Sequence, residues 1–324
     1  MAMAMKVLLT GGSSLLGRTT ARLLIERGDE VTCFQRSASG VATSEVRGDV
    51  RDRAALLDAS RGHDGVLHLA ALVGPRLPYQ GAYDVNVTGT VNAVEAAARC
   101  GRFVHVSSTA VGFAGGSAMG EGVGTATYAG SDVYATTKAI AERYVLDHLS
   151  VPTVVIRPHL VWGPGDTQLV ERIVTRVRAR RLRLPDHGRA LIDTTYLDDA
   201  AAALVAALDH AQAGEAAVGR AWIVTGDDPR PLAELVGGIL RAAGMDPVVP
   251  SVPAPLAAAA GWMFERWWRG SEPPLTYFSA RQLSLAHWFD QREVQAALGW
   301  TPRVSVAEGL IRLTRWFKET ARVE

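Results

Sequence analysis

Residues 6–17 read Lys6-Val7-Leu8-Leu9-Thr10-Gly11-Gly12-Ser13-Ser14-Leu15-Leu16-Gly17. The first five of these are mostly apolar and predict a short, buried parallel strand. The small residues that follow predict a tight turn, and residues 18–27 predict a helix that ends at Gly28. This order of strand, glycine-rich turn and helix is typical of the first unit of a doubly wound α/β sheet.

The turn is also a candidate anion site. Backbone N–H groups at the amino terminus of a helix, together with the helix dipole, favour a negatively charged group such as a pyrophosphate. The residues that we expect to meet it are Gly11, Ser13, Ser14, Leu15, Leu16 and Gly17. Ser14 stands where the usual spacing has a glycine, so the turn must keep its course with a small hydroxyl side chain.

The end of the second predicted strand, residues 29–35, bears on the choice between NAD and NADP. In folds that prefer NAD, an Asp or Glu at this point binds a ribose hydroxyl. Here the strand ends in Gln35 and Arg36, and an arginine can hold a 2′-phosphate instead. We therefore expect NADP to be preferred over NAD.

The alternation of strands and helices continues. Asp49 and Val50 follow a third short strand, and Asp49 could accept a hydrogen bond from an adenine amino group. Residues 66–69 predict a fourth strand, followed by small residues where a backbone must pass close to a ligand. Residues 103–106 predict a fifth strand, which ends in Ser107, Ser108 and Thr109.

Tyr134 and Lys138 add chemistry to this frame. Residues four apart on a helix share a face, so the phenol and the ammonium can point into one pocket. A positive charge beside a tyrosine lowers its pKa from the usual value of about 10, and such a tyrosine can exchange a proton near neutral pH. Alone, the pair could also be a chance feature of a solvated helix; after the glycine-rich turn and the serine-bearing strand end, it indicates an oxidoreductase.

Together these segments resemble the extended short-chain dehydrogenase/reductase family over essentially the whole chain. The residues that correspond to its motifs are Thr10 to Gly17, Asp49, His68 to Ala71, Asn86 to Thr90, Ser107 with Ser108, Tyr134 with Lys138, and Arg157-Pro158. The resemblance implies a Rossmann-type, doubly wound parallel sheet with a smaller, mostly helical C-terminal substrate lobe.

The same resemblance implies the catalytic roles. Tyr134 would be the general acid in ketone reduction, Lys138 would hold the nicotinamide ribose and tune Tyr134, and Ser108 would position the carbonyl oxygen. We favour Ser108 over Ser107 because Val111 follows it by three residues, as in the family. Besides the turn and Arg36, the implied cofactor-binding residues are Asp49, Val50, Leu69, Ala70, Ala71, Asn86, Tyr134, Lys138 and Pro158.

A closer resemblance comes from residues 156–166, 192–199 and 286–290, which are similar to the branch of 3β-hydroxysteroid dehydrogenases and bacterial sterol dehydrogenases. Within this branch the chain looks most like the 2-alkyl-3-oxoalkanoate reductases of bacterial long-chain olefin biosynthesis. Those enzymes of lipid metabolism use NADPH to reduce the ketone of a two-tailed β-keto acid. By this resemblance we expect Thr109, His159 and Trp162 to meet the substrate, and we expect no metal.

Three other functions stay open. A sterol or 3β-hydroxysteroid dehydrogenase would share every catalytic residue. A nucleotide-sugar dehydratase would carry an Asp-Glu pair where Thr109 and Ala110 follow Ser108, and an epimerase would have an acidic end on the second strand. A non-catalytic NADP-binding sensor would usually lack the pair Tyr134 and Lys138.

Composition limits the partners. The chain has 324 residues and a formal net charge of +1, which does not suggest nucleic acid or another polyanion. Its two cysteines, Cys33 and Cys100, suggest a reducing cytoplasm rather than a disulfide framework. We expect no signal peptide and no membrane span. By resemblance we expect a homodimer that forms through the helices bearing Asn86 and Tyr134.

The sequence predicts an NADP-binding domain over residues 1–228, of which 166–190 contribute to the substrate side, and a smaller substrate lobe over 229–324. Residues 257–269 of that lobe contain Trp262, Trp267 and Trp268. They could line an apolar cleft, dock a partner enzyme or a membrane surface, or form an ordinary core helix. The arginine-rich residues 172–183 are more typical of a solvated helix than of a site for a substrate carboxylate.

Overall fold

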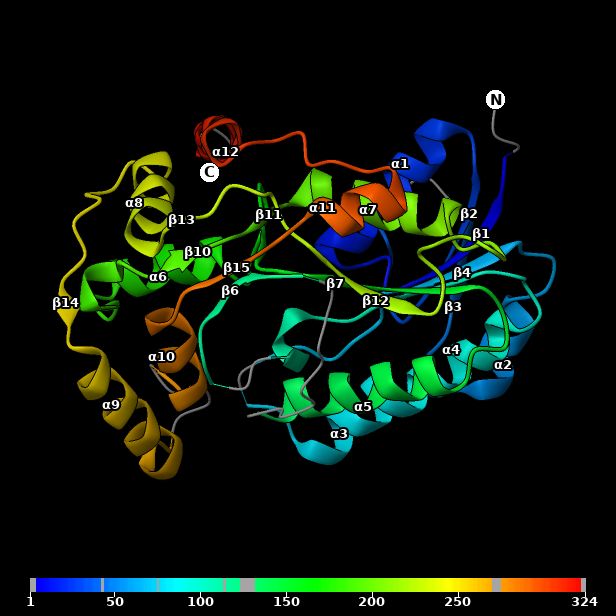
Figure 1. Ribbon diagram of the computed structural model, residues 1–324, viewed down its shortest axis with the longest axis horizontal. Coiled ribbons are helices and arrows are strands. Elements are labelled where there is room, and N and C mark those ends of the chain that lie inside the picture. The colour runs from blue at the N-terminus through cyan, green and yellow to red at the C-terminus, as the bar shows by residue number, and fades with distance from the viewer. Residues whose placement is uncertain are drawn as a thin grey trace.

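The computed structural model describes residues 4–41, 44–74, 76–112, 115–122, 132–269 and 275–321. A seven-stranded, fully parallel sheet runs through the larger part of the molecule (Figure 1). Its strands, in spatial order, are β12 (Arg220–Val224), β7 (Thr153–Pro158), β5 (Phe103–Val106), β4 (Gly65–His68), β1 (Lys6–Thr10), β2 (Glu30–Gln35) and β3 (Ser44–Arg47). The order turns back between β1 and β4, the point at which sheets of this kind bind a dinucleotide.

Helices cover both faces of the sheet (Figure 1). One face carries α1 (Leu15–Arg27), α7 (Leu197–Asp209) and α11 (Arg292–Leu298), and the other carries α2 (Arg53–Ala59), α4 (Gly89–Ala97) and α5 (Val133–Asp147). The helix α3 (Tyr79–Tyr83) and the π-helical turn η1 (Asp84–Thr88) lead into α4.

Alternation along the strands explains why both faces are covered. Successive side chains of a strand point to opposite faces, and the neighbours Leu8 and Leu9 are both fully buried, in different apolar clusters. Leu9 packs with Leu24 and Leu204 of the first helix layer, whereas Leu8 packs with Leu56 of the second. The sheet is therefore the shared wall of two cores, and its loops at the carboxyl ends of the strands are left to form a site.

The smaller lobe lies beyond the carboxyl ends of β7 and β12 (Figure 1). Its helices are α6 (Val170–Arg178), α8 (Leu232–Ala242), α9 (Ala254–Trp267), α10 (Tyr277–Ser284) and α12 (Val306–Thr320). The strands β13 (Arg230–Pro231), β10 (Leu191–Ile192), β15 (His287–Phe289) and β6 (Ala118–Glu121) pair in this order, β11 (Thr195–Tyr196) pairs with β8 (Val161–Trp162), and β14 (Ser251–Val252) pairs with β9 (Leu184–Pro185). Two 3-10 turns, η2 (Thr109–Gly112) and η3 (Asp186–Gly188), complete the elements.

The predicted fold class is confirmed, with local differences. The first strand and the fifth have the predicted bounds, but α1 begins at Leu15 because Ser14 caps it. Helix α7 starts after Tyr196, and Asp198 in its first turn pairs with Arg312. The division at residue 228 stays a prediction, and α11 packs with α1 and α7 on the sheet.

Candidate active site

The glycine-rich turn packs so closely that side chains would not fit at two of its positions. Gly11 has a φ of +80°, and a Cβ on it would lie 2.8 Å from the backbone nitrogen of Ala70. A Cβ on Gly17 would lie 2.3 Å from the carbonyl oxygen of Gly11. Ser14 fits because its hydroxyl is used: it donates to Gly11 O at 2.8 Å and accepts from Gly17 N at 3.0 Å. The serine thus caps α1 and holds the turn where the usual pattern has a glycine.

A cavity of about 140 Å³ opens beside this turn, at the carboxyl ends of β1, β2 and β4. Its lining contains the predicted cofactor residues Gly11, Ser13, Ser14, Arg36, Asp49, Val50, Leu69, Ala70 and Ala71, together with Phe34, Gln35, Ser37, Gly48 and Val85. Leu15, Leu16 and Gly17 are the first residues of α1, next to the turn. The predicted cofactor residues in this lining come from four separate segments of the chain, so the topology brings most of the predicted set together.

The polar groups of this cavity fit the adenosine end of a dinucleotide. Gln35 is only 5% exposed, and neither its amide oxygen nor its amide nitrogen has a hydrogen-bond partner within the part of the chain that the structure describes. Asp49 is paired with Arg51 at 2.7 Å, and the hydrogen bonds from Arg51 lower the pKa of Asp49 to about 2. An unsatisfied amide in a cavity is the mark of a missing polar ligand.

Asn86 is hydrogen-bonded within the protein. It is fully buried, accepts from Leu72 N at 2.6 Å, and donates to Leu72 O and to Thr137 Oγ1. Both of its N–H donors are therefore used within the protein. Asn86 thereby ties the loop after β4 to helix α5, and its contact with the cofactor stays a prediction.

The three predicted catalytic residues converge at the carboxyl ends of β5 and its neighbours. Asp132 caps α5 by accepting from Ala135 N at 2.7 Å, which places Tyr134 in the first turn of the helix. The Tyr134 phenol is hydrogen-bonded to the side chain of Ser108, which follows β5. Ser108 Oγ also accepts from Ala110 N at 3.2 Å, and Lys138 Nζ donates to Val106 O at 2.5 Å. Pro158, the last residue of β7, ends at the same edge of the sheet.

The pKa of Tyr134 shifts in the direction opposite to the one that the sequence predicts. Burial raises the pKa of Tyr134 above its ordinary value, the hydrogen bond from Ser108 opposes this rise, and the charge of Asp132 adds to it. Burial lowers the pKa of Lys138 to about 8, partly offset by the charge of Glu142. The expected lowering of the Tyr134 pKa by Lys138 is therefore not found in this structure: burial raises this pKa, and Lys138 is not among the groups that shift it.

Two of the three residues predicted to meet the substrate are core residues. Trp162 is 1% exposed and donates from its ring nitrogen to Thr194 Oγ1 at 2.9 Å. His159 is 2% exposed, and its two ring nitrogens bind Thr109 and His287. The ring nitrogens of Trp162 and His159 are thus used within the protein, and direct contacts of these residues with the substrate stay predictions. Thr109 is half-buried next to Ser108, and its contact with the substrate stays a prediction.

The tryptophan-rich helix α9 is not an ordinary core helix. Trp262 is 58% exposed and Trp267 is 70% exposed, and only Ala257 and Gly261 are buried. Gly261 lies against the backbone of Thr276 at the start of α10. The apolar face of α9 therefore points away from the lobe.

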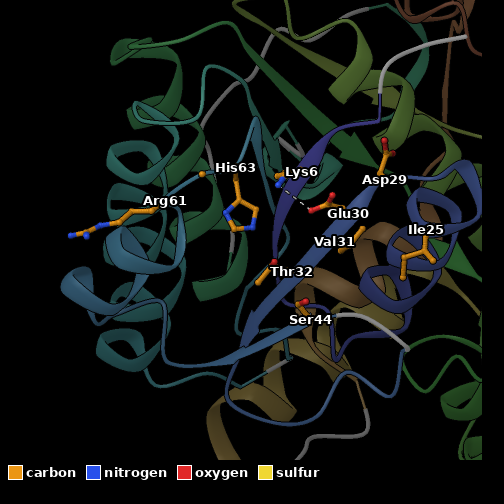
Figure 2. A pocket seen from close by; sticks show the side chains of 10 residues that line it. Lys6, Ile25, Asp29, Glu30, Val31, Thr32, Ser44, Arg61 and His63 are labelled. Carbon is orange, nitrogen blue, oxygen red and sulfur yellow. Dashed lines mark ion pairs between the residues drawn. The ribbon is translucent and has the colours of Figure 1, made fainter.

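A second hollow lies at the opposite edge of the sheet, at the amino ends of β1, β2 and β3 (Figure 2). It is larger, about 540 Å³, but its charged groups are already paired. Lys6 lies 3.3 Å from Glu30, Asp29 binds Arg27, and Arg61 binds Asp58. This hollow lies at the amino ends of the strands, whereas Tyr134 lies at their carboxyl ends. We therefore do not assign the chemistry to it.

The described residues were compared with two further kinds of site, a metal cluster and a membrane-spanning helix. Over the ranges given above, no three His, Cys, Asp or Glu side chains gather in a way that could hold a metal ion. In the same ranges, none of the helices has the length and apolarity needed to cross a bilayer.

Three contributors to the site were missed at the level of sequence. His287 lies in a run that we quoted for its resemblance only, and nothing local indicates that it reaches His159. Arg51 sits two residues after Asp49, and that spacing could have indicated the pair. The unpaired amide of Gln35 becomes visible only once its burial is known.

Known proteins resemble this chain in sequence and in fold. The family model described as the NAD dependent epimerase/dehydratase family matches residues 7–222. The chain is 40% identical to a 2-alkyl-3-oxoalkanoate reductase of Stenotrophomonas maltophilia, over 95% of this chain and 98% of that protein. It is 27% identical to a 3-beta-hydroxysteroid dehydrogenase of Mycolicibacterium neoaurum, over 97% of this chain and 92% of that protein.

Among solved structures, a short-chain dehydrogenase/reductase superfamily protein of Agrobacterium tumefaciens with bound NAD has a TM-score of 0.76 at 22% identity, and the match covers 98% of each chain. A UDP-glucuronic acid 4-epimerase of Bacillus cereus in complex with NAD has a TM-score of 0.74 at 19% identity, over 97% of this chain and 99% of that one. At these identities the likeness shows a shared fold.

Proposed function

This chain belongs to the NAD dependent epimerase/dehydratase family, and on that premise we propose that it uses NADPH to reduce the ketone of a 2-alkyl-3-oxoalkanoic acid to the 2-alkyl-3-hydroxyalkanoic acid. The observation that carries the proposal is the convergence of Ser108, Tyr134 and Lys138 at the carboxyl ends of the strands, the edge of the sheet that also holds the glycine-rich turn and its cavity. The relative at 40% identity, named for this reaction, supports the choice of substrate.

The bound nicotinamide would supply the hydride, and the protein would manage the charge that then develops on the ketone oxygen. Tyr134 and Ser108 are hydrogen-bonded to each other, so both hydroxyls are within reach of a single oxygen atom. Two donors aimed at a developing oxyanion are the usual means of stabilising it. The raised pKa of Tyr134 keeps its proton on the phenol at neutral pH, which suits a proton donor in the reductive direction.

Lys138 would act as the cation of the site. Its ammonium is held by Val106 O, one turn of helix from Tyr134, and with a pKa of about 8 it is mostly charged at neutral pH. The positive charge favours negative charge on the neighbouring phenol after the proton has left it. We propose that Lys138 also holds the nicotinamide ribose, and that Pro158 lies against the nicotinamide.

The preference for NADPH rests on the end of β2. No carboxylate stands at the tip of this strand, where Gln35 and Arg36 line the cavity. The nearby Asp49 is already neutralised by Arg51. A 2′-phosphate would therefore meet a cationic surface and an unsatisfied amide, and it would meet no free acid.

A second candidate is a 3β-hydroxysteroid dehydrogenase, favoured by the relative at 27% identity. It would use the same three catalytic residues on another bulky apolar substrate. A nucleotide-sugar epimerase or dehydratase is disfavoured because Thr109 and Ala110, and no acidic residue, follow Ser108. A non-catalytic sensor is disfavoured by the intact Ser108, Tyr134 and Lys138 set.

The experiment is a comparison of NADPH and NADH oxidation with a 2-alkyl-3-keto acid, a 3-ketosteroid and a nucleotide-sugar. We expect the keto acid with NADPH to give the highest kcat/KM. A faster 3-ketosteroid would favour the second candidate, and a clear advantage of NADH would contradict the role given to Arg36. Absence of oxidation with every ketone would refute the proposed function.

We also propose that the enzyme works in the cytoplasm as a homodimer that forms through α4 and α5. Cys33 and Cys100 are both free thiols and buried, as expected of a protein from a reducing compartment. Ile140 on α5 is 37% exposed and is a candidate contact. Light scattering of the purified protein should give twice the chain mass, and Ile140→Asp should reduce it to one chain.

A further inference from the structure

A chain of buried hydrogen bonds connects the turn after Ser108 to the smaller lobe. Thr109 Oγ1 lies 2.6 Å from His159 Nδ1, His159 Nε2 lies 2.8 Å from His287 Nδ1, and His287 Nε2 lies 2.9 Å from Gln282 O. The two histidines are 2% and 3% exposed. We call this set of four residues the Thr109–Gln282 relay. It spans the end of β5, the loop after β7, strand β15 and helix α10.

The end of the relay fixes the direction of every proton in it. Gln282 O is a backbone carbonyl and can only accept, so His287 Nε2 must carry the hydrogen. A neutral imidazole has one N–H, so His287 Nδ1 accepts from His159 Nε2 and His159 Nδ1 accepts from the Thr109 hydroxyl. Burial lowers the pKa of both histidines, which keeps them neutral at physiological pH. The network itself thus assigns both tautomers.

The lobe has a structural reason to supply that carbonyl. Gln282 lies in the last turn of α10, where carbonyl groups have no partner four residues ahead in the helix. His287 Nε2 satisfies this one. The backbones of both histidines are held as well, because His159 N donates to Val224 O at 3.2 Å and His287 O accepts from Asp193 N at 3.0 Å. The relay is therefore fixed to the seven-stranded sheet at His159 and to the four-stranded sheet at His287.

At its other end the relay holds the turn that carries Ser108. Thr109 is the first residue of η2, and Val111 N donates to Ser108 O across this turn. Ala110 N donates to Ser108 Oγ, the group that binds the Tyr134 phenol. Because the Thr109 hydroxyl has given its hydrogen to His159, it can offer only lone pairs to any other neighbour. Thr109 therefore cannot donate a hydrogen bond to the carboxylate of the proposed substrate.

We propose that His159 and His287 are positioning residues for ketone reduction: they anchor the Thr109 hydroxyl to α10 and so hold Ser108 against Tyr134. The kinetic part of this inference rests on the proposed function, whereas the relay and its proton directions do not. Two measurements test the proton directions of the relay and its effect on kcat separately.

The first measurement needs no substrate. Histidine side chains labelled with ¹⁵N show by NMR which ring nitrogen carries the proton, and His159→Asn and His287→Asn assign the two signals. We expect both histidines to be neutral and protonated at Nε2 at neutral pH. A proton on Nδ1 of either ring, or a charged imidazolium at neutral pH, would overturn the relay.

The second measurement uses a matched pair of variants. In His159→Asn the amide lies near the former Nδ1 and can still accept from Thr109, whereas in His159→Gln the same amide reaches toward His287 and leaves Thr109 without its acceptor. With whichever ketone the wild type reduces fastest, we expect His159→Asn to have an intermediate kcat, because it keeps the acceptor for Thr109 but loses the bond to His287. We expect His159→Gln to lose roughly 10- to 100-fold, since small misplacements of catalytic groups have costs of this size. The Kd for NADPH should not change in either variant.

Thr109 provides the internal control. Thr109→Val should lose kcat as His159→Gln does, Thr109→Ser should not, and the double variant Thr109→Val/His159→Gln should lose no more than either single one, because all remove one interaction. His148→Gln, exposed at the end of α5, should behave like wild type. Three results would show a merely structural role and overturn the proposal. The first is an equal kcat of His159→Asn and His159→Gln, and the second is an additive loss in the double variant. The third is a fall in the melting temperature of these variants with kcat intact. A wild type that reduces no ketone would sink the proposed function and leave the NMR result to decide the relay.

Discussion

Replacing Lys138 by methionine should change how the stability of the protein depends on pH. The ammonium of Lys138 is 2% exposed, and its burial lowers its pKa from 10.5 to about 8. That difference corresponds to about 3 kcal/mol of unfavourable free energy for carrying the charge in the folded state. The folded protein bears this cost in full where Lys138 is protonated in both states, which is below about pH 8.

The sign follows from proton uptake. Between about pH 8 and pH 10.5 the folded lysine is neutral while the unfolded one is still protonated, so the unfolded state binds more protons and stability rises with pH. Lys138→Met has no such group. The free energy of unfolding of the wild type, minus that of Lys138→Met, should therefore rise by roughly 2–3 kcal/mol from about pH 7 to about pH 10.

Urea denaturation of both proteins without cofactor, at several pH values, measures this difference, and other titrating groups cancel because both proteins contain them. Lys318→Met is the matched control: Lys318 is exposed on α12, and its removal should give a difference that does not vary with pH. A flat difference for Lys138→Met as well, or one that falls with pH, would show that Lys138 is not held as a buried cation.

Other substitutions test the surroundings of the site. Glu142→Gln leaves the buried Arg157 without its charged partner and should lower the free energy of unfolding by roughly 3–5 kcal/mol. Glu319→Gln, at an exposed position, is the control, and a loss of roughly 1 kcal/mol or less in Glu142→Gln would contradict the buried pair. Gly11→Ala places a Cβ against the backbone of Ala70 at a φ of +80° and should cost about 1–3 kcal/mol of stability and weaken NADPH binding; unchanged melting temperature and Kd would argue against the close approach. Arg36→Asp should reduce the ratio of kcat/KM for NADPH over NADH by roughly 10- to 100-fold, the worth of a hydrogen bond to a charged group, and an unchanged ratio would remove Arg36 from the cofactor site.

The first strand, the glycine-rich turn and the meeting of Ser108, Tyr134 and Lys138 could be predicted because their signals are local or periodic. The strand at residues 6–10, the turn and the Tyr134 and Lys138 spacing each depend on a few neighbouring residues, and the parallel topology then fixes which strand ends meet. The family and its relatives confirm the resemblance that these motifs indicated.

The burial of His159 and Trp162 was not visible in the sequence, because sequence does not tell which way a side chain turns after a strand. His159 and Trp162 follow β7 closely, but packing against the lobe turns both into the interior. The direction of the Tyr134 pKa was missed for a related reason, since a charge four residues away is visible in sequence and burial is not. The partnership of His159 with His287 joins residues 128 positions apart and becomes apparent only in three dimensions.

We propose that Tyr134 donates a proton to a ketone oxygen beside a bound nicotinamide. Tyr134→Phe tests this role, assayed for NADPH binding by fluorescence and for NADPH oxidation with the 2-alkyl-3-keto acid. We expect an unchanged Kd for NADPH and a loss of turnover on the order of a hundred- to ten-thousand-fold. Turnover equal to that of the wild type would contradict it.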